Sequence, residues 1–524
     1  MQKLTRYIII LMSIFIICSQ QIIAQGTSPV GVNFVLVNFN QPPTPSTLIV
    51  KKAPLKYNKD FALSFQVDDT DVDIYDLGFP VFAGGTIGGT QYPGFYYSDG
   101  CGNQHSFKMS AAIFIYSGST LNGLDKDVLN PDNNYDKLHW DELDTLFQNG
   151  WGVQNHGING GGTEVNYSVK RNKSYVRRNL YNSMAGGVVS HSLVNPNGNQ
   201  AFTPVAFDNR YICAINQGGN SPIGNDGGGN VNNDTVDWTL PHRIGRRYAI
   251  NASSFADDMA SASTGGANYW GTIFTHNLSG TPGGISFNNF LNNFTDISST
   301  YGINGLDNIL MTTDEEIQDY LIVRDATTLN YTLAGTTLLI TYSGEVPDNL
   351  LYYSSTIVIN SDATITNITV DGATDYTRTP NGQTDALINL NWDGYAVIPA
   401  EVLADSMVTI GLVDSNQLDC WVAMDYVITM TNGSHKDSLR KLLCDIPNNV
   451  YDPGFCDCSI SLQQTEITMC PEDCEWLLGA PGYATYEWWV DDTLYATSQD
   501  TIVCPTDTTT VYTQIATNTL GCPA

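Results

Sequence analysis

Two adjacent carboxylates stand where the chain pattern predicts the end of a β-strand. Asp68 and Asp69 close the apolar run FALSFQV, and neighbouring side chains on a strand point to opposite sides. Two histidines hold comparable positions, since His156 follows WGVQN and His276 follows GTIFT. Hydrolysis at a metal uses carboxylate and imidazole ligands, an open position for water, and a second carboxylate that takes the proton. These four residues are therefore the candidate site, with one acid as metal ligand and the other as base.

The elements predicted around these residues alternate between strands and helices. Apolar runs bounded by glycine predict strands, and apolar residues recurring on one face predict helices. The expected strands are 61–69, 108–118, 151–157 and 271–277, and the expected helices are 138–150, 173–184 and 313–323. This order is typical of a parallel α/β sheet or barrel, in which functional groups lie at the carboxyl ends of the strands.

The hydrophobic pattern of the sequence changes near residue 325, where helical periodicity ends and short β-type runs begin. We expect a β-sandwich there, followed by further β modules. The predicted parts are a signal peptide at 1–25, an α/β domain at 26–325, a β-sandwich at 326–412, a cysteine-bearing linker or β segment at 413–465, and a β module at 466–524. Whether this last module is truncated stays open at this point.

The amino terminus reads as an export signal. Lys3 and Arg6 precede the apolar run YIIILMSIFIIC, and small residues follow it. No later segment approaches the roughly 18 apolar residues that a membrane span needs, so we expect a secreted or cell-surface protein. The formal net charge of −30 argues against nucleic acid and anionic membranes as partners. The sequence indicates no oligomeric state.

The cysteines are concentrated toward the carboxyl end. Of 11, Cys18 lies in the predicted signal, and eight fall between Cys420 and Cys522. The even number left in an exported chain favours disulfides, although CDCS and CPEDC imitate metal-ligand spacing.

The order of several motifs resembles the polysaccharide deacetylase family, the NodB-like carbohydrate esterases with a distorted (β/α) barrel. The motifs are LSFQVDDT, AAIFIYSG, LHWDELDTLFQNGWGVQNHG, VNPNGN and WGTIFTHN, and they span roughly residues 55 to 325. The last part of the chain also resembles the Ig-like or PKD-like modules of secreted Bacteroidetes proteins.

The resemblance implies a role for each candidate residue. Asp68 takes the place of the catalytic base, and Asp69 and His156 take the places of ligands to a divalent metal, expected to be zinc. His276 takes the place of the general acid that supports the leaving group. The loop 195–198 matches the one whose backbone amide helps hold the oxyanion.

The sequence departs from the family pattern at the expected second histidine ligand. That ligand should come four residues after His156, where this chain has Gly160. Because two protein ligands hold zinc poorly, a third has to come from elsewhere, and Asn159 and His105 are the candidates.

Three other family positions differ. The glycine after the paired acids is Thr70, the serine or threonine after the first histidine is Gly157, and the arginine before the proline-glycine loop is Val194. Structural interpretations also stay open, since a strand-end acid pair can cap a helix or bind calcium loosely, and a histidine after a strand can be purely structural.

Three functions follow from the motifs and their departures. The first is an exported esterase that removes N- or O-acetyl groups from a polysaccharide. The second is a degenerate NodB-like fold that binds glycan or serves in adhesion without catalysis, which Gly160 favours. The third, cleavage of a glycosidic bond, needs a facing carboxylate pair that the sequence does not identify.

Overall fold

A computed structural model describes residues 27–117, 126–132, 136–159, 164–183, 190–216, 222–224, 226–394, 400–449, 451–452, 455–456, 474–480, 483–490, 493–505 and 510–518. The predicted signal peptide lies outside these residues. The chain forms two compact units, one comprising 1–117, 126–173 and 189–397 and the other 118–125, 174–188 and 398–524.

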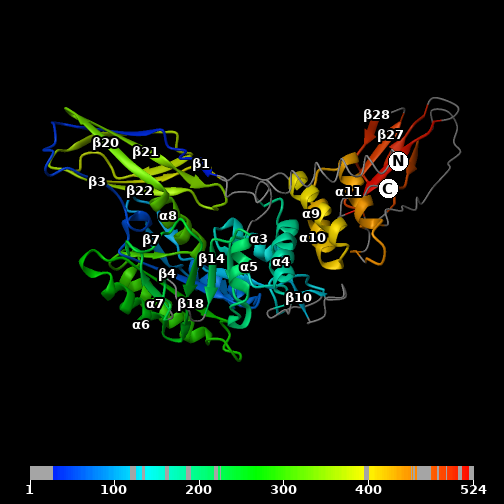
Figure 1. Cartoon of the computed structure of the whole chain (residues 1–524), viewed down its shortest axis with the longest axis horizontal. Helices are drawn as coiled ribbons and strands as arrows, with labels where there is room; N and C mark the ends of the chain where they lie inside the picture. The colour runs from blue at the N-terminus through cyan, green and yellow to red at the C-terminus, as the bar shows by residue number, and fades with distance from the viewer. Residues whose placement is uncertain are drawn as a thin grey trace. The chain divides into compact units, whose positions relative to one another are not determined.

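The first unit contains a largely parallel sheet of ten described strands (Figure 1). Eight lie in the order β15-β18-β4-β9-β12-β13-β14-β16, while β17 also pairs with β18 and β19 with β4. The strands are β4 (Phe61–Val67), β9 (Ser110–Ile113), β12 (Gly152–Asn155), β13 (Ser192–Val194), β14 (Cys213–Asn216), β15 (Gly228–Asn230), β16 (His242–Gly245), β17 (Arg247–Tyr248), β18 (Tyr269–Thr275) and β19 (Ile309–Met311).

The sheet nearly closes into a barrel at Arg246. This residue separates β16, which pairs with β14, from β17, which pairs with β18. Because consecutive residues pair with opposite ends of the strand order, the chain itself bridges the gap. The expectation of a barrel-like α/β sheet is confirmed at this level.

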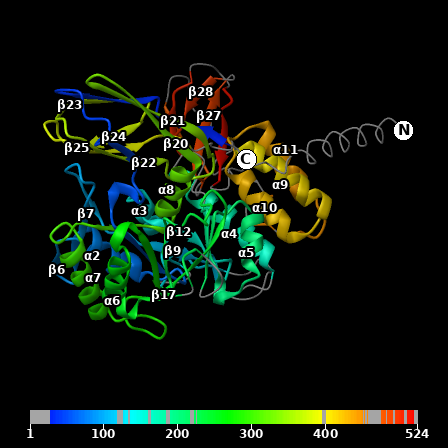
Figure 2. The ribbon, with the colours of Figure 1, turned by 60° about the vertical axis from the view of Figure 1, so that its left-hand side comes forward.

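Helices follow most strands of the barrel. The expected helix at 138–150 forms as α3, with Leu143 and Leu146 buried, and the helix at 313–323 begins after Thr313, whose hydroxyl accepts from Glu316 N–H. Both views show α6 and α7 beside each other (Figures 1 and 2). The α-helices of this region are α2 (Phe79–Ala83), α3 (Trp140–Gln148), α4 (Val165–Asn179), α5 (Phe202–Asp208), α6 (Ala252–Ala262), α7 (Phe287–Tyr301) and α8 (Asp314–Ala326).

Three short two-stranded hairpins among the described residues lie in the connections between barrel strands. They pair β5 with β6, β7 with β8, and β10 with β11. Their bounds are β5 (Gly85–Ile87), β6 (Thr90–Tyr92), β7 (Tyr96–Ser98), β8 (Gln104–Ser106), β10 (Tyr116–Ser117) and β11 (Lys126–Asp127).

Two antiparallel sheets make up the rest of the first unit, and both include strands from the amino-terminal part of the chain. One has the order β1-β21-β2-β23 with β20 beside β21, and the other has the order β24-β25-β22-β3. The strands are β1 (Thr27–Pro29), β2 (Phe34–Phe39), β3 (Ile49–Lys52), β20 (Thr327–Ala334), β21 (Thr337–Pro347), β22 (Ser354–Asn360), β23 (Ile365–Asp371), β24 (Asp375–Arg378) and β25 (Asp385–Asn391).

The placement of β1 to β3 differs from the expected start of the α/β domain at residue 26. In β2, buried residues alternate with partly exposed ones, which suits an antiparallel sheet with one face on a core. Strand pairing over more than 300 residues of sequence, such as Val35 with Val370, is invisible to a local pattern.

The second unit is partly helical, which corrects the expectation of a linker or β segment at 413–465. Helices α9 (Ala400–Asp414), α10 (Gln417–Ile428) and α11 (Ser434–Cys444) pack against one another. Because α9 and α10 are apolar on most sides, they lack the one-sided period that marks an amphipathic helix. The strands beyond them are β26 (Glu475–Leu477), β27 (Thr485–Val490), β28 (Thr493–Ala496), β29 (Thr501–Val503) and β30 (Thr513–Thr517). The Ig- or PKD-like nature of this module stays a prediction.

Disulfides join Cys444 to Cys456 and Cys474 to Cys504, which agrees with the expectation that cysteines near the carboxyl end form disulfides. Cys101, Cys213 and Cys420 are free thiols. Among the described helices, none is long and apolar enough to cross a membrane.

Candidate functional site

The turn after β4 is strained and heavily hydrogen-bonded. Asp69 and Thr70 both have left-handed backbones, with φ of 65° and 58°. Such a conformation is uncommon outside glycine, and for a β-branched residue it is an outlier that surrounding contacts must enforce. Thr70 N–H donates to the Ala112 carbonyl at 3.2 Å, and its hydroxyl both donates to the Phe114 carbonyl and accepts from Phe114 N–H, each at 2.9 Å. The Thr70 hydroxyl therefore holds the turn through contacts that a glycine at this position could not make.

Asp68 is buried in a bidentate ion pair with Arg246. The two guanidinium nitrogens lie 2.8 and 2.7 Å from the two carboxylate oxygens, and the side chains are 1% and 4% exposed. Arg246 also donates to Gln66 Oε1 at 3.0 Å and lies 3.9 Å above the ring of Phe274. Two parallel N–H to oxygen bonds fix both the position and the plane of a carboxylate. Arg246 thus orients Asp68 and provides its countercharge.

Asp69 faces His156 instead. Its side chain is 40% exposed, and its Oδ1 lies 3.4 Å from His156 Nε2. The imidazole Nδ1 lies 2.9 Å from the Val194 carbonyl, which can only accept, so Nδ1 carries the proton. In a neutral imidazole, Nε2 would turn a lone pair toward the carboxylate, and a cation between the two atoms removes that conflict.

The ionisation of this pair reflects the same conflict. Burial opposes the charged form of both groups, but the contact between them outweighs it. The pKa of His156 is raised, mainly by Asp69 and then by the charge of Asp68, and the pKa of Asp69 is lowered, mainly by His156. The structure therefore favours a carboxylate beside a positive charge.

His276 follows β18, the strand next to β4, and is partly exposed. Its Nδ1 donates to the Gly283 carbonyl at 2.7 Å, which leaves Nε2 available. Its charge contributes to the lowered pKa of Asp69, as does that of Lys137. The structure therefore brings all four sequence-predicted residues to the carboxyl end of the parallel strands.

The described residues do not complete a zinc site. No group of three histidines, cysteines or acids among them is placed to hold a metal ion. Asp69 and His156 are suitable ligands, and a ring nitrogen that donates to a carbonyl is typical of a metal-bound histidine. His105 is not a third, because it stacks on Tyr57 at 4.9 Å, and Gly160 lies outside the described residues.

The loop predicted to hold an oxyanion lies beside the His156 turn. Pro196–Gly198 form a short 3-10 turn after β13. Gly157 has φ of 74°, and a Cβ there would come within 3.2 Å of Pro196 Cγ and 2.8 Å of Ser168 Oγ. Glycine at this position is thus explained by backbone conformation and close packing.

Two residues of the site were not predicted from the sequence. Arg246 lies in the run RIGRRY, with nothing to show that the chain crosses the barrel seam there. Lys137 donates from Nζ to the Asp69 carbonyl at 2.9 Å and so supports the strained turn. His191, by contrast, is buried, and its Nε2 lies 2.9 Å from Asp319 Oδ1.

No protein-family model matches the chain, and no curated protein matches it. One similar solved structure is the Streptococcus pyogenes deacetylase PplD in complex with acetate, with 15% identity and a TM-score of 0.21 over 30% of this chain and 55% of that one. The chain thus spans about half the length of that protein. Another is a Mycobacterium smegmatis protein assigned as a polysaccharide deacetylase, with 9% identity and a TM-score of 0.27 over 53% of this chain and 93% of that one. At such TM-scores neither likeness establishes a shared fold.

Proposed function

We propose that the chain is a secreted carbohydrate esterase with a NodB-like barrel, and that it removes N- or O-acetyl groups from a polysaccharide. The observation that carries this proposal is the division of two adjacent carboxylates between two environments. Asp68 is sealed against Arg246, whereas Asp69 is 40% exposed beside His156. Pairs of titratable groups in different surroundings at strand ends are typical of acid-base sites.

In the proposed reaction Asp68 is the general base. It takes a proton from the water whose oxygen attacks the acetyl carbonyl carbon, while Arg246 keeps the carboxylate oriented. The bond from that carbon to nitrogen or oxygen then breaks. His276, in its protonated form, gives a proton from Nε2 to the leaving atom, which yields acetate and a free amine or hydroxyl group.

A divalent metal, expected to be zinc from the family resemblance, would polarise the acetyl carbonyl when bound. Asp69 and His156 are the two ligands that the chain supplies among its described residues, and no step above depends on a metal. Elemental analysis of the mature protein beside His156→Ala addresses metal binding separately. About one equivalent of metal, lost in the variant, would show that His156 is one of its ligands.

The test of the function is acetate release from N-acetylated chitin oligosaccharides and from O-acetylated xylan. Wild-type protein should release acetate from at least one of them, and Asp68→Asn should not. Asp71→Asn is a matched control, because it removes a carboxylate from the same turn. The control should retain most of the activity, and equal loss in both variants would point to damage of the turn.

The alternative is a NodB-like module that binds glycan without turnover. The incomplete ligand set among the described residues favours it. Saccharide binding by wild-type protein, with no acetate release with or without added zinc, would establish this alternative.

A further inference from the structure

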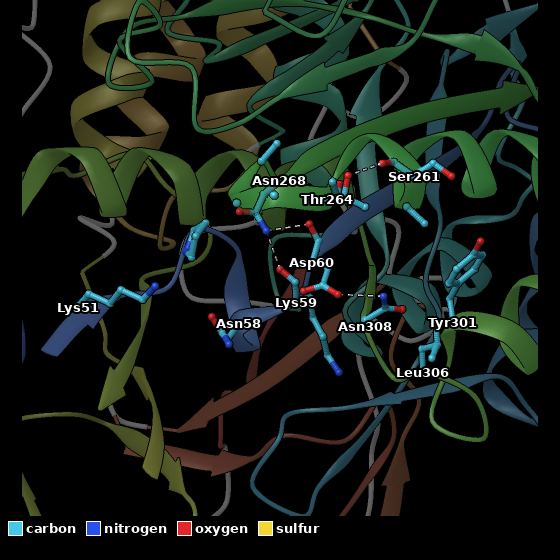
Figure 3. Close-up of a pocket in the computed structure, with 16 residues that line it drawn as sticks. Lys51, Asn58, Lys59, Asp60, Ser261, Thr264, Asn268, Tyr301, Leu306 and Asn308 are labelled. Carbon is cyan, nitrogen blue, oxygen red and sulfur yellow. Dashed lines mark hydrogen bonds between the residues drawn. The ribbon is translucent and has the colours of Figure 1, made fainter. Parts of the chain in front are cut away.

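A hollow of about 760 Å³ opens at the amino-terminal ends of three barrel strands (Figure 3). Asp60 immediately precedes β4, Asn268 precedes β18 and Asn308 precedes β19, and all three line it. Because these strands are parallel, the hollow lies at the opposite end of β4 and β18 from Asp68 and His276. Its volume is in the range of small-molecule sites, so it is a separate place where a ligand can bind.

The floor of the hollow is held by its own hydrogen bonds, drawn as dashed lines in Figure 3. Asn268 Nδ2 donates to the backbone carbonyls of Asp60 at 2.8 Å and of Lys59 at 3.2 Å. Asn308 Nδ2 donates to Asp60 Oδ2 at 3.0 Å. Asn308 Oδ1 is a buried acceptor with no partner among the described residues. Because that oxygen has almost no accessible surface, the acceptors that a ligand in the hollow can reach are those of the exposed Asp60 and Asn58 side chains.

The sides of the hollow supply donors and an apolar surface. Lys51 and Asn58 are exposed, and their side chains make no hydrogen bond with the described part of the chain. Figure 3 shows Lys51 directed toward the hollow from one side, with Leu306 and Tyr301 on the other. Leu306 is 69% exposed, so its apolar side chain is accessible to a ligand in the hollow.

We propose that this hollow binds a saccharide segment, a second contact for the polysaccharide substrate; the substrate class rests on the proposed function. Sugar hydroxyls both donate and accept, so they match acceptors on the exposed Asp60 and Asn58 together with a donor on Lys51. The C–H face of a sugar ring suits contact with Leu306. The Asp60 carboxylate would repel an anion and the Lys51 ammonium would repel a cation. A neutral polyol is repelled by neither group.

The experiment measures binding of fully N-acetylated chitotetraose to the full mature chain by calorimetry. Thr264→Trp places an indole in the hollow at an exposed lining position, and Leu306→Ala removes the apolar contact. Leu240→Ala is the control, because Leu240 is 55% exposed and does not line the hollow. We expect affinity to fall at least about tenfold in Thr264→Trp, by less in Leu306→Ala, and not at all in Leu240→Ala.

A second readout separates this proposal from the function itself. Acetate release from glucose pentaacetate, which is too small to reach both sites, should be the same in Thr264→Trp and wild type. Unchanged affinity for chitotetraose in Thr264→Trp, or no binding by wild-type protein at millimolar concentration, would overturn the saccharide site. Loss of acetate release in Asp68→Asn with hollow-dependent binding retained would support both assignments.

Discussion

The barrel holds two groups of charged residues that differ in how completely they are sealed. The strand-end site consists of Asp68, Asp69, His156, Arg246 and His276. The buried acidic cluster consists of Lys56 and three consecutive acids at the start of α8, Asp314, Glu315 and Glu316.

Every acid of the buried cluster is at most 5% exposed. Lys56 Nζ lies 2.7 Å from Glu316 Oε1, and Asp314 accepts hydrogen bonds from Ser64 and Gln66 at 2.6 and 2.8 Å. No left-handed backbone occurs within these three acids. In the strand-end site, by contrast, Asp69 is partly exposed and its backbone is strained. The same residue types thus form a cluster closed on all sides at the start of α8, whereas at the strand ends the buried pair of Asp68 and Arg246 adjoins a partly exposed acid, Asp69.

The largest expected difference between the strand-end site and the buried acidic cluster is in catalysis. Asp68→Asn should reduce acetate release by about 10²–10⁴-fold, because the general base is lost. It should also lower the free energy of unfolding, since Arg246 is left buried without its countercharge, at a cost of about 3–5 kcal/mol. The double variant with Arg246→Met should recover stability but not activity. Recovery of activity in the double variant would remove Asp68 from the chemistry.

The next largest effect is expected in the buried cluster. Lys56→Met leaves Glu316 buried without its closest cation and should lower the free energy of unfolding by about 3–5 kcal/mol in urea titrations. The rate of acetate release per folded molecule should not change at a temperature where the variant is folded. A fall in that rate with stability unaltered would reverse the roles assigned to the two groups.

A smaller effect is expected in the pH dependence of stability, which should depend on Glu315 of the buried acidic cluster. Burial, followed by the charge of Asp314, raises the pKa of Glu315 to about 7 from its usual 4.5. The folded state then keeps a proton that the unfolded chain releases, so stability is lost as pH rises between these two values. Glu315→Gln should match wild type near pH 4 and exceed it above pH 7, by up to about 3 kcal/mol. Stability curves that stay parallel across this range would contradict the assignment.

The smallest effect concerns the support of the strained turn. Lys137→Met removes one hydrogen bond to the Asp69 carbonyl and should cost about 1 kcal/mol of stability. A looser turn should lower kcat several-fold, and Lys137→Arg should restore most of the loss by supplying a donor. Equal kinetics in Lys137→Met and wild type would show that the turn is held without this lysine.

The sequence was sufficient to locate the parts of the site that follow apolar runs. Asp68, His156 and His276 come directly after strands whose burial is continuous, and that pattern is local. Arg246 could not be found in this way, because its partner is 178 residues away and depends on closure of the barrel. The same limit hid the pairing of β1 to β3 with strands beyond residue 337.

The sequence also failed to predict two helices of the second unit, because neither has a single apolar face. The α9 and α10 segments bury Val408 and Trp421 but are apolar on their outer sides too, so sequence periodicity gave no sign of them. The roles of the four site residues and the metal stay predictions, since geometry alone brings them together without assigning chemistry.

Acetate release by the mature wild-type protein decides whether the strand-end site hydrolyses acetyl groups. The assay would follow acetate from N-acetylated chitotetraose and O-acetylated xylan, with and without added zinc. We expect turnover on at least one substrate, and its loss in both Asp68→Asn and the double variant with Arg246→Met. No acetate from either substrate under either condition, in protein that still binds chitotetraose, would contradict this expectation and establish a binding module.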